Sequence, residues 1–237
     1  RHLWLLSGTG EGPKIAQSLI SQGWKITVSV VSLQAALPYK DLPLEEIKVG
    51  PLEGKVGIIK VLQESLVSFG GFDWVLDATH PFAEIISCDL REACKAFGQS
   101  LLRYERPLKK EQEGTLIRKL SDLSRFDLSE QRLLMAIGSR FLREAVLSAG
   151  DAGAKVFARI LPGPESLRKG LKASLPESNL ALFRPLLGPS PGALEAALCR
   201  KWFITGVVCR QSGGSSEEIW RDICFRDNLD LWLIARP

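Results

Sequence analysis

Short, mainly apolar runs alternate with helical stretches along the first hundred residues, and this alternation restricts the fold more than any other feature. Strands are expected over residues 3–6, 25–31, 46–49, 72–76 and 100–104. A short apolar run that ends in a glycine-rich or polar turn is typical of a buried parallel strand. Five strands alternating with helices predict an α/β fold with a parallel, doubly wound sheet, in which the first and fourth strands are neighbours.

A second α/β pattern begins after the polar stretch 108–114, which has the composition of a linker. Further strands are expected over 115–120, 133–137, 154–160, 180–183, 202–208 and 231–235, with helices around 141–149, 165–173, 191–200 and 216–226. The break in the pattern predicts two domains, residues 1–107 and residues 108–237.

The composition narrows the class of protein. Five cysteines without a Cys-x-x-Cys pair argue for reduced thiols in a cytoplasm, and two histidines argue against a metal centre. The net charge of +4 is scattered along the chain, so nucleic acid is not implied. No run approaches the roughly 20 apolar residues of a membrane span. The sequence enters a strand directly, without a charged leader and cleavage site. It opens on Arg1 rather than on an initiator methionine, which suggests that leading residues are missing.

A glycine-rich turn, Ser7–Gly12, follows the first expected strand and precedes a helix. This arrangement binds diphosphates, because glycines allow a close approach of the backbone and the first N–H groups of the helix favour negative charge. Gly8 and Gly10 fit the dinucleotide fingerprint, but Pro13 stands where the third glycine belongs. A tight strand-to-helix turn without a nucleotide therefore remains the alternative.

The fourth expected strand runs into Asp77-Ala-Thr-His-Pro-Phe-Ala83. We expect Pro81 in the first turn of the next helix, which places Thr79 and His80 on the turn at the carboxyl end of the strand. Ligands bind at that edge of an open parallel sheet, so this turn and the glycine loop would line one crevice. In the alternative, Thr79 is only an N-cap, Asp77 only a turn former and His80 only a surface residue.

The second strand ends in Ser29 and Ser32 without an acidic residue. Enzymes that prefer NAD usually carry an Asp or Glu near this point to hold the ribose 2′-hydroxyl, so its absence favours NADP. No arginine stands at this strand end to bind a 2′-phosphate, which weakens the preference.

These landmarks together resemble the precorrin-6A reductase family of cobalamin biosynthesis over nearly the whole chain. The resemblance is carried by residues 8–11, 77–83, 101–107, 138–140, 159–162, 188–189 and 212–213, and by the closing Arg236-Pro237. It implies two Rossmann-like domains with the active site in the cleft between them. It also implies NADPH-dependent reduction of precorrin-6A to precorrin-6B, by hydride transfer to a carbon–carbon double bond of the macrocycle. Similar enzymes of the anaerobic branch act on the cobalt-bearing precursor, and NADH is then an alternative cofactor.

The resemblance also implies roles for the cofactor-binding residues. The diphosphate would be held by Gly8, Thr9 and Gly10 at a helix begun by Glu11, and Ser29 is the candidate for the 2′-phosphate region. The nicotinamide side would be lined by Thr79, His80, Pro81 and Phe82. His80 is the candidate catalytic proton donor because it is the well-placed residue that titrates near neutral pH, although an ordered water or a macrocycle nitrogen would serve as well.

The implied substrate is a tetrapyrrole with many carboxylate arms, which guanidinium groups match in geometry. The candidate substrate ligands are Arg103, Arg106, Ser139, Arg140, Arg159, Arg210, Gln211, Ser212 and Gly213. For each arginine a structural role is the alternative, for example an ion-pair cluster of Arg103 and Arg106 with Glu105. The partner is thus expected to be a polycarboxylate small molecule, and the chain a monomer or weak homo-oligomer.

One stretch departs from the family pattern. Family members usually carry Thr-Lys-Asn/Asp-Ser-Gly where this chain has Val208–Gly213, so Arg210 replaces the lysine and Gln211 the Asn or Asp. Arginine keeps the charge but cannot donate a proton at neutral pH. If the lysine only pairs with a carboxylate, activity survives; if it donates a proton, activity is impaired. A reductase of another substrate, and a regulatory protein that binds nucleotide without turnover, remain alternatives.

Overall fold

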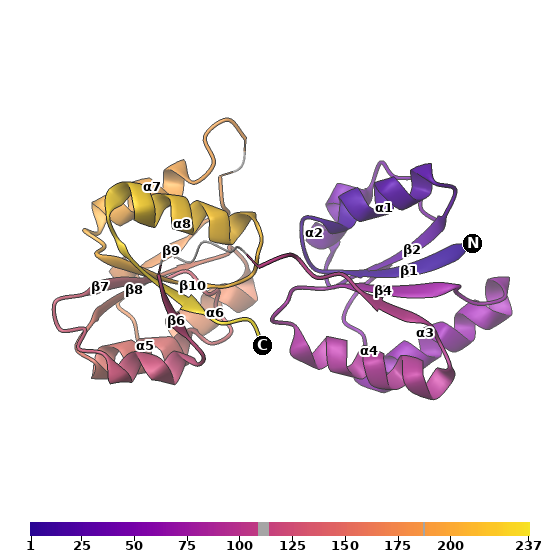
Figure 1. Cartoon of the computed structure of the whole chain (residues 1–237), viewed down its shortest axis with the longest axis horizontal. Helices are drawn as coiled ribbons and strands as arrows, with labels where there is room; N and C mark the ends of the chain where they lie inside the picture. The colour runs from indigo at the N-terminus through magenta and orange to yellow at the C-terminus, as the bar shows by residue number, and fades with distance from the viewer. Residues whose placement is uncertain (109–113, 187) are drawn as a thin grey trace. The chain divides into compact units, whose positions relative to one another are not determined.

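The computed structural model describes residues 1–108, 114–186 and 188–237, and the chain divides into two compact units. Unit 1 comprises Arg1–Glu105 with Pro237, and unit 2 comprises Arg106–Arg236. Each unit is an α/β layer structure whose strand pairs, in the described residues, are all parallel (Figure 1). The α/β fold class is confirmed, whereas residues 109–113 of the predicted linker lie outside the described residues.

Unit 1 contains a five-stranded sheet in the order β3-β2-β1-β4-β5. Its strands are β1 (His2–Ser7), β2 (Lys25–Val30), β3 (Glu46–Val49), β4 (Trp74–Ala78) and β5 (Leu101–Arg103). The predicted pairing of the first and fourth strands is confirmed, with Ser7 opposite Ala78. The winding direction reverses between these two strands, and ligands bind at such a reversal in open α/β sheets.

Helices cover both faces of this sheet (Figure 1). They are α1 (Gly12–Ser21), α2 (Leu33–Ala36), the short 3₁₀ helix η1 (Leu37–Tyr39), α3 (Gly54–Phe69) and α4 (Glu84–Phe97). The alternation of side chains along β1 serves both layers, because Trp4 and Leu6 join the core beneath α3 and α4. Leu3 and Leu5 join the opposite core with Ala16 of α1. Burial on both faces explains why residues 3–6 of β1 are all apolar rather than alternating with polar residues.

Unit 2 contains a six-stranded sheet in the order β6-β11-β10-β7-β8-β9. Its strands are β6 (Thr115–Ile117), β7 (Arg132–Met135), β8 (Lys155–Ile160), β9 (Leu180–Leu182), β10 (Gly206–Arg210) and β11 (Asp230–Ile234). Its helices are α5 (Leu142–Asp151), α6 (Pro164–Leu171), α7 (Ala193–Lys201) and α8 (Ser215–Asp227), with 3₁₀ helices η2 (Leu120–Arg125) and η3 (Glu177–Asn179). Helices α7 and α8 cover one face and α5 and α6 the other (Figure 1).

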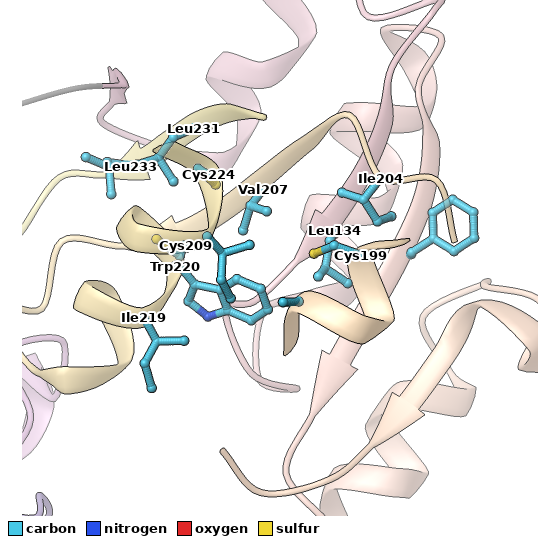
Figure 2. Close-up of a cluster of buried hydrophobic side chains, with 13 residues drawn as sticks. Leu134, Cys199, Ile204, Val207, Cys209, Ile219, Trp220, Cys224, Leu231 and Leu233 are labelled. Atoms are coloured by element: carbon cyan, nitrogen blue, oxygen red, sulfur yellow. The ribbon is translucent and has the colours of Figure 1, made fainter. Parts of the chain in front are cut away.

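The core beneath α7 and α8 contains three buried cysteines, Cys199, Cys209 and Cys224, which lie among branched side chains and Trp220 (Figure 2). Burial raises the pKa of Cys199 and of Cys224 to about 12, and it raises the pKa of Cys209 even further. These thiols therefore act as small apolar groups in the core, as buried cysteines generally do.

Two local predictions are wrong. Trp202 was expected to begin a strand, but it is the C-cap of α7, and β10 begins only at Gly206. The turn between them contains Phe203 at φ 51, so the apolar run 202–208 changes direction instead of extending. Pro81 was expected inside the first turn of a helix, but α4 begins at Glu84. Within the described residues, no helix is both long and apolar enough to span a bilayer.

Candidate active site

The glycine loop after β1 lies against the turn that contains His80. A Cβ added to Gly8 would lie 3.7 Å from the backbone nitrogen of His80 and 3.9 Å from the Cα of Thr79. The closeness follows from the pairing of β1 with β4, because parallel strands end at the same edge of the sheet. The structure thus brings together the two motifs that the sequence singles out in the first half of the chain.

The glycines of this loop have different local roles. A Cβ added to Gly12, the first residue of α1, would lie 1.9 Å from Ser7 Oγ and 2.0 Å from Tyr39 Oη, so only glycine fits there. A Cβ added to Gly10 would meet no atom within 4 Å. The space towards which a Gly10 side chain would point is therefore open. The Gly12 N–H donates to the Thr9 oxygen at 3.3 Å and Pro13 has no N–H, so α1 offers an anion mainly the positive end of its dipole.

Asp77 is the centre of a hydrogen-bond network behind the His80 turn. Its carboxylate is 2% exposed and accepts the backbone N–H of Thr79 at 3.0 Å and the Thr79 hydroxyl at 2.7 Å. Arg103 Nη1 donates to Asp77 Oδ2 at 2.5 Å, to Thr79 Oγ1 at 3.0 Å and to Ser87 Oγ at 2.7 Å. The network joins β4, β5 and α4, and it holds Thr79 in place.

Sequence reasoning missed both Asp77 and Ser87 as partners of Arg103. The signal is the strand register, because Asp77 and Arg103 stand opposite each other on β4 and β5. Arg103, a predicted substrate ligand, therefore directs its guanidinium towards a buried carboxylate of its own unit.

His80 is held by its own turn. Its Nδ1 accepts the backbone N–H of Phe82 at 3.2 Å, and its backbone oxygen accepts the N–H of Ala83 at 2.8 Å. The centroids of the His80 and Phe82 rings are 5.8 Å apart. Because Nδ1 is an acceptor here, the proton of the neutral imidazole lies on Nε2. The side-chain bond at Nδ1 also explains why α4 starts after Pro81, since it stabilises a separate turn.

Ser29 does not join these loops. Its hydroxyl is buried and accepts the indole N–H of Trp4 at 2.8 Å. Ser32, in contrast, is an exposed N-cap whose Oγ accepts the N–H of Ala35 at 3.3 Å, at the end of β2. Of the two serines that the sequence places at this strand end, Ser32 is the one whose hydroxyl reaches the surface.

In unit 2, the structure brings Arg140 and Arg210 to one aromatic ring. Ser139 and Arg140 lie in the turn between β7 and α5, and Arg210 ends the neighbouring strand β10. The Cζ atom of Arg140 lies 5.1 Å, and that of Arg210 5.9 Å, from the centroid of Phe141. Burial lowers the pKa of Arg210, and the charge of Arg140 lowers it further.

The loop after β10 is shaped by contacts within unit 2. Arg106 Nη1 donates to the backbone oxygen of Ser212 at 3.2 Å. Gln211 Oε1 accepts the backbone N–H of Arg236 at 3.3 Å. A Cβ added to Gly213, which has φ 70, would lie 2.7 Å from Arg236 Nη2. Arg106, Gln211 and Ser212 thus have hydrogen-bond partners within unit 2, and Gly213 lies against Arg236. These contacts hold the chain that follows Arg210 in one conformation.

Arg159 lies in a buried ion pair rather than at the surface. Its Nη2 is 3.6 Å from Glu195 Oε1, and its Cζ lies 5.1 Å from the Phe183 centroid. Burial lowers the pKa of Arg159, whereas Glu195 raises it. Among the described residues, Nε and Nη2 of Arg159 have no hydrogen-bond partner. The described residues also contain no group of three or more His, Cys, Asp or Glu side chains arranged to hold a metal ion.

Comparison with a family model, with curated relatives and with a solved structure leads to one protein family. Residues 2–237 match the family model described as Precorrin-6x reductase CbiJ/CobK. The chain is 30% identical to the cobalt-precorrin-6A reductase of Synechocystis over 99% of its own length and 88% of that protein. It is 28% identical to the precorrin-6A reductase of Rhodobacter capsulatus, with the same two coverages. The solved structure of CobK precorrin-6A reductase superposes with a TM-score of 0.75 at 26% identity, covering 100% of this chain and 88% of that one.

Proposed function

The chain belongs to the precorrin-6x reductase family, and on that premise we propose that it reduces precorrin-6A to precorrin-6B with NADPH. It is an oxidoreductase of cobalamin biosynthesis that acts on a carbon–carbon double bond. One observation carries the proposal: a loop suited to a diphosphate lies directly against the turn with the candidate proton donor, at the reversal point of the sheet. The cofactor and the reacting centre would then meet at the edge of the sheet where β1 and β4 end.

The glycine loop would hold the diphosphate of the cofactor. Gly8, Thr9 and Gly10 would leave the backbone accessible, and the positive end of the α1 dipole behind Glu11 would favour the phosphate charge. When bound, NADPH supplies the hydride. The 2′-phosphate region would be formed by the exposed hydroxyl of Ser32 rather than by the buried Ser29. The absence of an acidic residue at the end of β2 supports NADPH over NADH.

The His80 turn would line the nicotinamide side, with Thr79, Pro81 and Phe82. Reduction of a double bond adds a hydride to one carbon and a proton to its neighbour, and His80 Nε2 is the atom from which the proton would come. The fixed Nδ1 contact with Phe82 orients the ring. The Asp77 network holds Thr79 beside it, which keeps the turn in one geometry before ligands arrive.

The substrate would be recognised through its carboxylate arms. The leading candidates are Arg140, whose side chain is exposed, and Arg210, which ends β10 and lies near the same aromatic ring as Arg140. The other predicted ligands would act mainly by shaping the site, each through its own partners: Arg103, Arg106, Ser139, Arg159, Gln211, Ser212 and Gly213. All five cysteines are free thiols, which supports a reducing, cytoplasmic location.

An anaerobic single-turnover experiment tests the proposal. Purified protein is mixed with NADPH and precorrin-6A, and the loss of reduced nicotinamide absorbance is followed. Parallel mixtures contain NADH or cobalt-precorrin-6A. We expect fast oxidation with NADPH and precorrin-6A. Faster oxidation with the cobalt-bearing substrate or NADH would reassign the branch or the cofactor, and NADPH binding without oxidation in any mixture would contradict a reductase function.

A further inference from the structure

Each unit contains a glycine turn that leads from a parallel strand into a helix. In unit 1 the turn joins β1 to α1, and in unit 2 residues 211–214 join β10 to α8. A turn of this kind places backbone N–H groups next to the positive end of a helix dipole, so either turn could hold an anion. The two turns differ in whether the helix itself supplies a carboxylate to the turn.

Glu217 supplies such a carboxylate in unit 2. It stands in the first turn of α8, and its Oε2 accepts the backbone N–H of Gly213 at 2.7 Å. Its Oε1 accepts the Nε–H of Arg221, one helical turn further along, also at 2.7 Å. The side chains of Glu217 and Arg221 are 1% and 12% exposed. The buried carboxylate thus makes the contacts that a bound anion would make at this helix end.

The other N–H groups of this turn also have acceptors within unit 2. The Gln211 N–H donates to the Ile234 oxygen at 2.9 Å, and the Ser212 N–H donates to the Arg210 oxygen at 2.8 Å. The Gly214 N–H donates to the Ser212 hydroxyl at 3.4 Å. Each N–H group of the turn is therefore already used by the protein, so an external anion would have to displace an internal acceptor.

The first turn of α1 has no counterpart of Glu217, because residues 12–15 are Gly-Pro-Lys-Ile. Among the described residues, the side chain of the N-cap Glu11 makes no capping hydrogen bond. The positive end of the α1 dipole therefore has no buried carboxylate from its own first turn, and it keeps its attraction for a ligand with negative charge.

We propose that Glu217 is a built-in anion that closes the glycine turn of unit 2 and so leaves the diphosphate of the cofactor to the turn of unit 1. The role given to the unit 1 turn rests on the proposed function, whereas the closure of the unit 2 turn does not. Glu217 is then a positioning residue that acts through Gly213, and it determines which of the two units takes the nucleotide.

The first test asks whether a small anion can take the place of the Glu217 carboxylate. Urea unfolding of the full-length Glu217→Ala variant is measured in sodium formate and, at equal ionic strength, in sodium chloride. At ten times its Kd, formate should raise the urea midpoint of this variant by about 0.5 M. Wild type and Glu218→Ala, which removes an exposed acid from the same helical turn, should show no difference between the salts. An absent or equal formate effect in Glu217→Ala would overturn the proposal.

A second variant keeps the test decisive if Glu217→Ala does not fold. Glu217→Gln preserves the size of the side chain and removes its charge, and amide hydrogen exchange at Gly213 is followed by NMR. We expect exchange about tenfold faster than in wild type, because a neutral acceptor holds the N–H less strongly. Glu218→Gln should leave the exchange rate of Gly213 unchanged. A wild-type rate in Glu217→Gln would show that the charge is not needed and would overturn the built-in anion.

NADPH titration separates this proposal from the reductase proposal. Glu217→Ala should keep the wild-type Kd for NADPH, whereas Gly10→Ala in the unit 1 turn should raise it. A loss of affinity in Glu217→Ala as large as that in Gly10→Ala would contradict the assignment of the diphosphate to unit 1. Formate rescue in a protein that binds no NADPH would contradict the cofactor proposal and support the closure of the unit 2 turn.

Discussion

Arg159 and Glu195 form an ion pair that is almost completely withdrawn from solvent, with side chains 9% and 1% exposed. The pair has no dense set of hydrogen bonds around it, since two guanidinium nitrogens and Glu195 Oε2 lack partners among the described residues. Each member is therefore stabilised chiefly by the other. A buried charge that loses its partner is costly, because neither water nor protein compensates it.

We predict that Glu195→Gln lowers the free energy of unfolding by about 3 kcal/mol or more, because Arg159 is left as an unpaired buried cation. Urea unfolding at neutral pH measures the change. The matched control is Glu165→Gln, which removes the partner of Arg168 in an exposed pair and should cost less than about 1 kcal/mol. Equal losses in the two variants would contradict the interpretation.

His80 is expected to act in turnover rather than in cofactor binding. His80→Ala should lower the single-turnover rate by about 10²-fold or more, the usual contribution of a positioned proton donor, with a smaller change in the Kd for NADPH. His80→Gln separates two roles, because its amide can replace the Nε2–H hydrogen bond but cannot transfer a proton. A wild-type rate in His80→Ala would remove the residue from the chemistry, and rescue by glutamine would leave it a hydrogen-bond role only.

The candidate residues were predictable from the sequence where a strand ends in a polar turn, as for Gly8, Thr79 and His80. They were not predictable where the role of a residue depends on the direction of its side chain or on the register between two strands. Ser29 looks the same in sequence whether its hydroxyl is exposed or, as observed, accepts the Trp4 indole N–H. Likewise, the sequence offers Arg103 a substrate carboxylate or Glu105 as its partner, and only the strand register places it opposite Asp77.

At the scale of elements, the start of α1 depends on Gly12, the glycine of the Ser7–Gly12 turn that has no room for a side chain. We predict that Gly12→Ala destabilises unit 1 by about 1–3 kcal/mol, because the new methyl group overlaps the Ser7 and Tyr39 hydroxyls. Gly10→Ala should leave stability nearly unchanged, since its Cβ would point into open space. If the loop holds a diphosphate, however, Gly10→Ala should weaken NADPH binding.

Urea unfolding and NADPH titration of both variants check this pair. Destabilisation by Gly10→Ala equal to that by Gly12→Ala would contradict the packing argument. Unchanged NADPH affinity in Gly10→Ala would contradict the assignment of the loop to the diphosphate.

Most elements were predictable because buried parallel strands are short and apolar and the helices between them are longer. The residues at which elements begin and end were less predictable. β6 stops at Ile117, before the expected end at 120, because η2 begins at Leu120. The start of β10 is displaced because Phe203 adopts a left-handed conformation, which aromatic residues rarely do and which no local pattern indicates. The short α2 has too few residues for a periodic signal.

At the scale of the whole molecule, four buried thiols link stability to alkaline pH. Burial raises the pKa of Cys94 to about 11 and of Cys199 and Cys224 to about 12, and it raises the pKa of Cys209 as well. In the unfolded chain a cysteine ionises near pH 8.5. The folded state therefore keeps protons that the unfolded state releases, so stability is full below about pH 8 and is lost as the pH rises towards the folded pKa values.

We predict that the free energy of unfolding falls between pH 8.5 and 10.5 by up to about 1.4 kcal/mol per pH unit for each buried thiol. Urea unfolding over this range measures the slope. Cys224→Ala should reduce the slope, whereas Cys88→Ala, at the exposed cysteine, should keep it. An identical slope in wild type and Cys224→Ala would show that other groups control the alkaline transition.

The position of β11 has a consequence for the order in which the chain becomes structured during synthesis. All strands of unit 1 lie within the first 103 residues, so its sheet can close while the ribosome is still translating unit 2. In unit 2, the last strand in chain order lies between β6 and β10, and β11 is the partner to which β6 is paired. β6 therefore leaves the ribosome more than a hundred residues before its partner. The nascent chain would carry a finished first domain and an open strand edge, which is the stage at which a chaperone has most to protect.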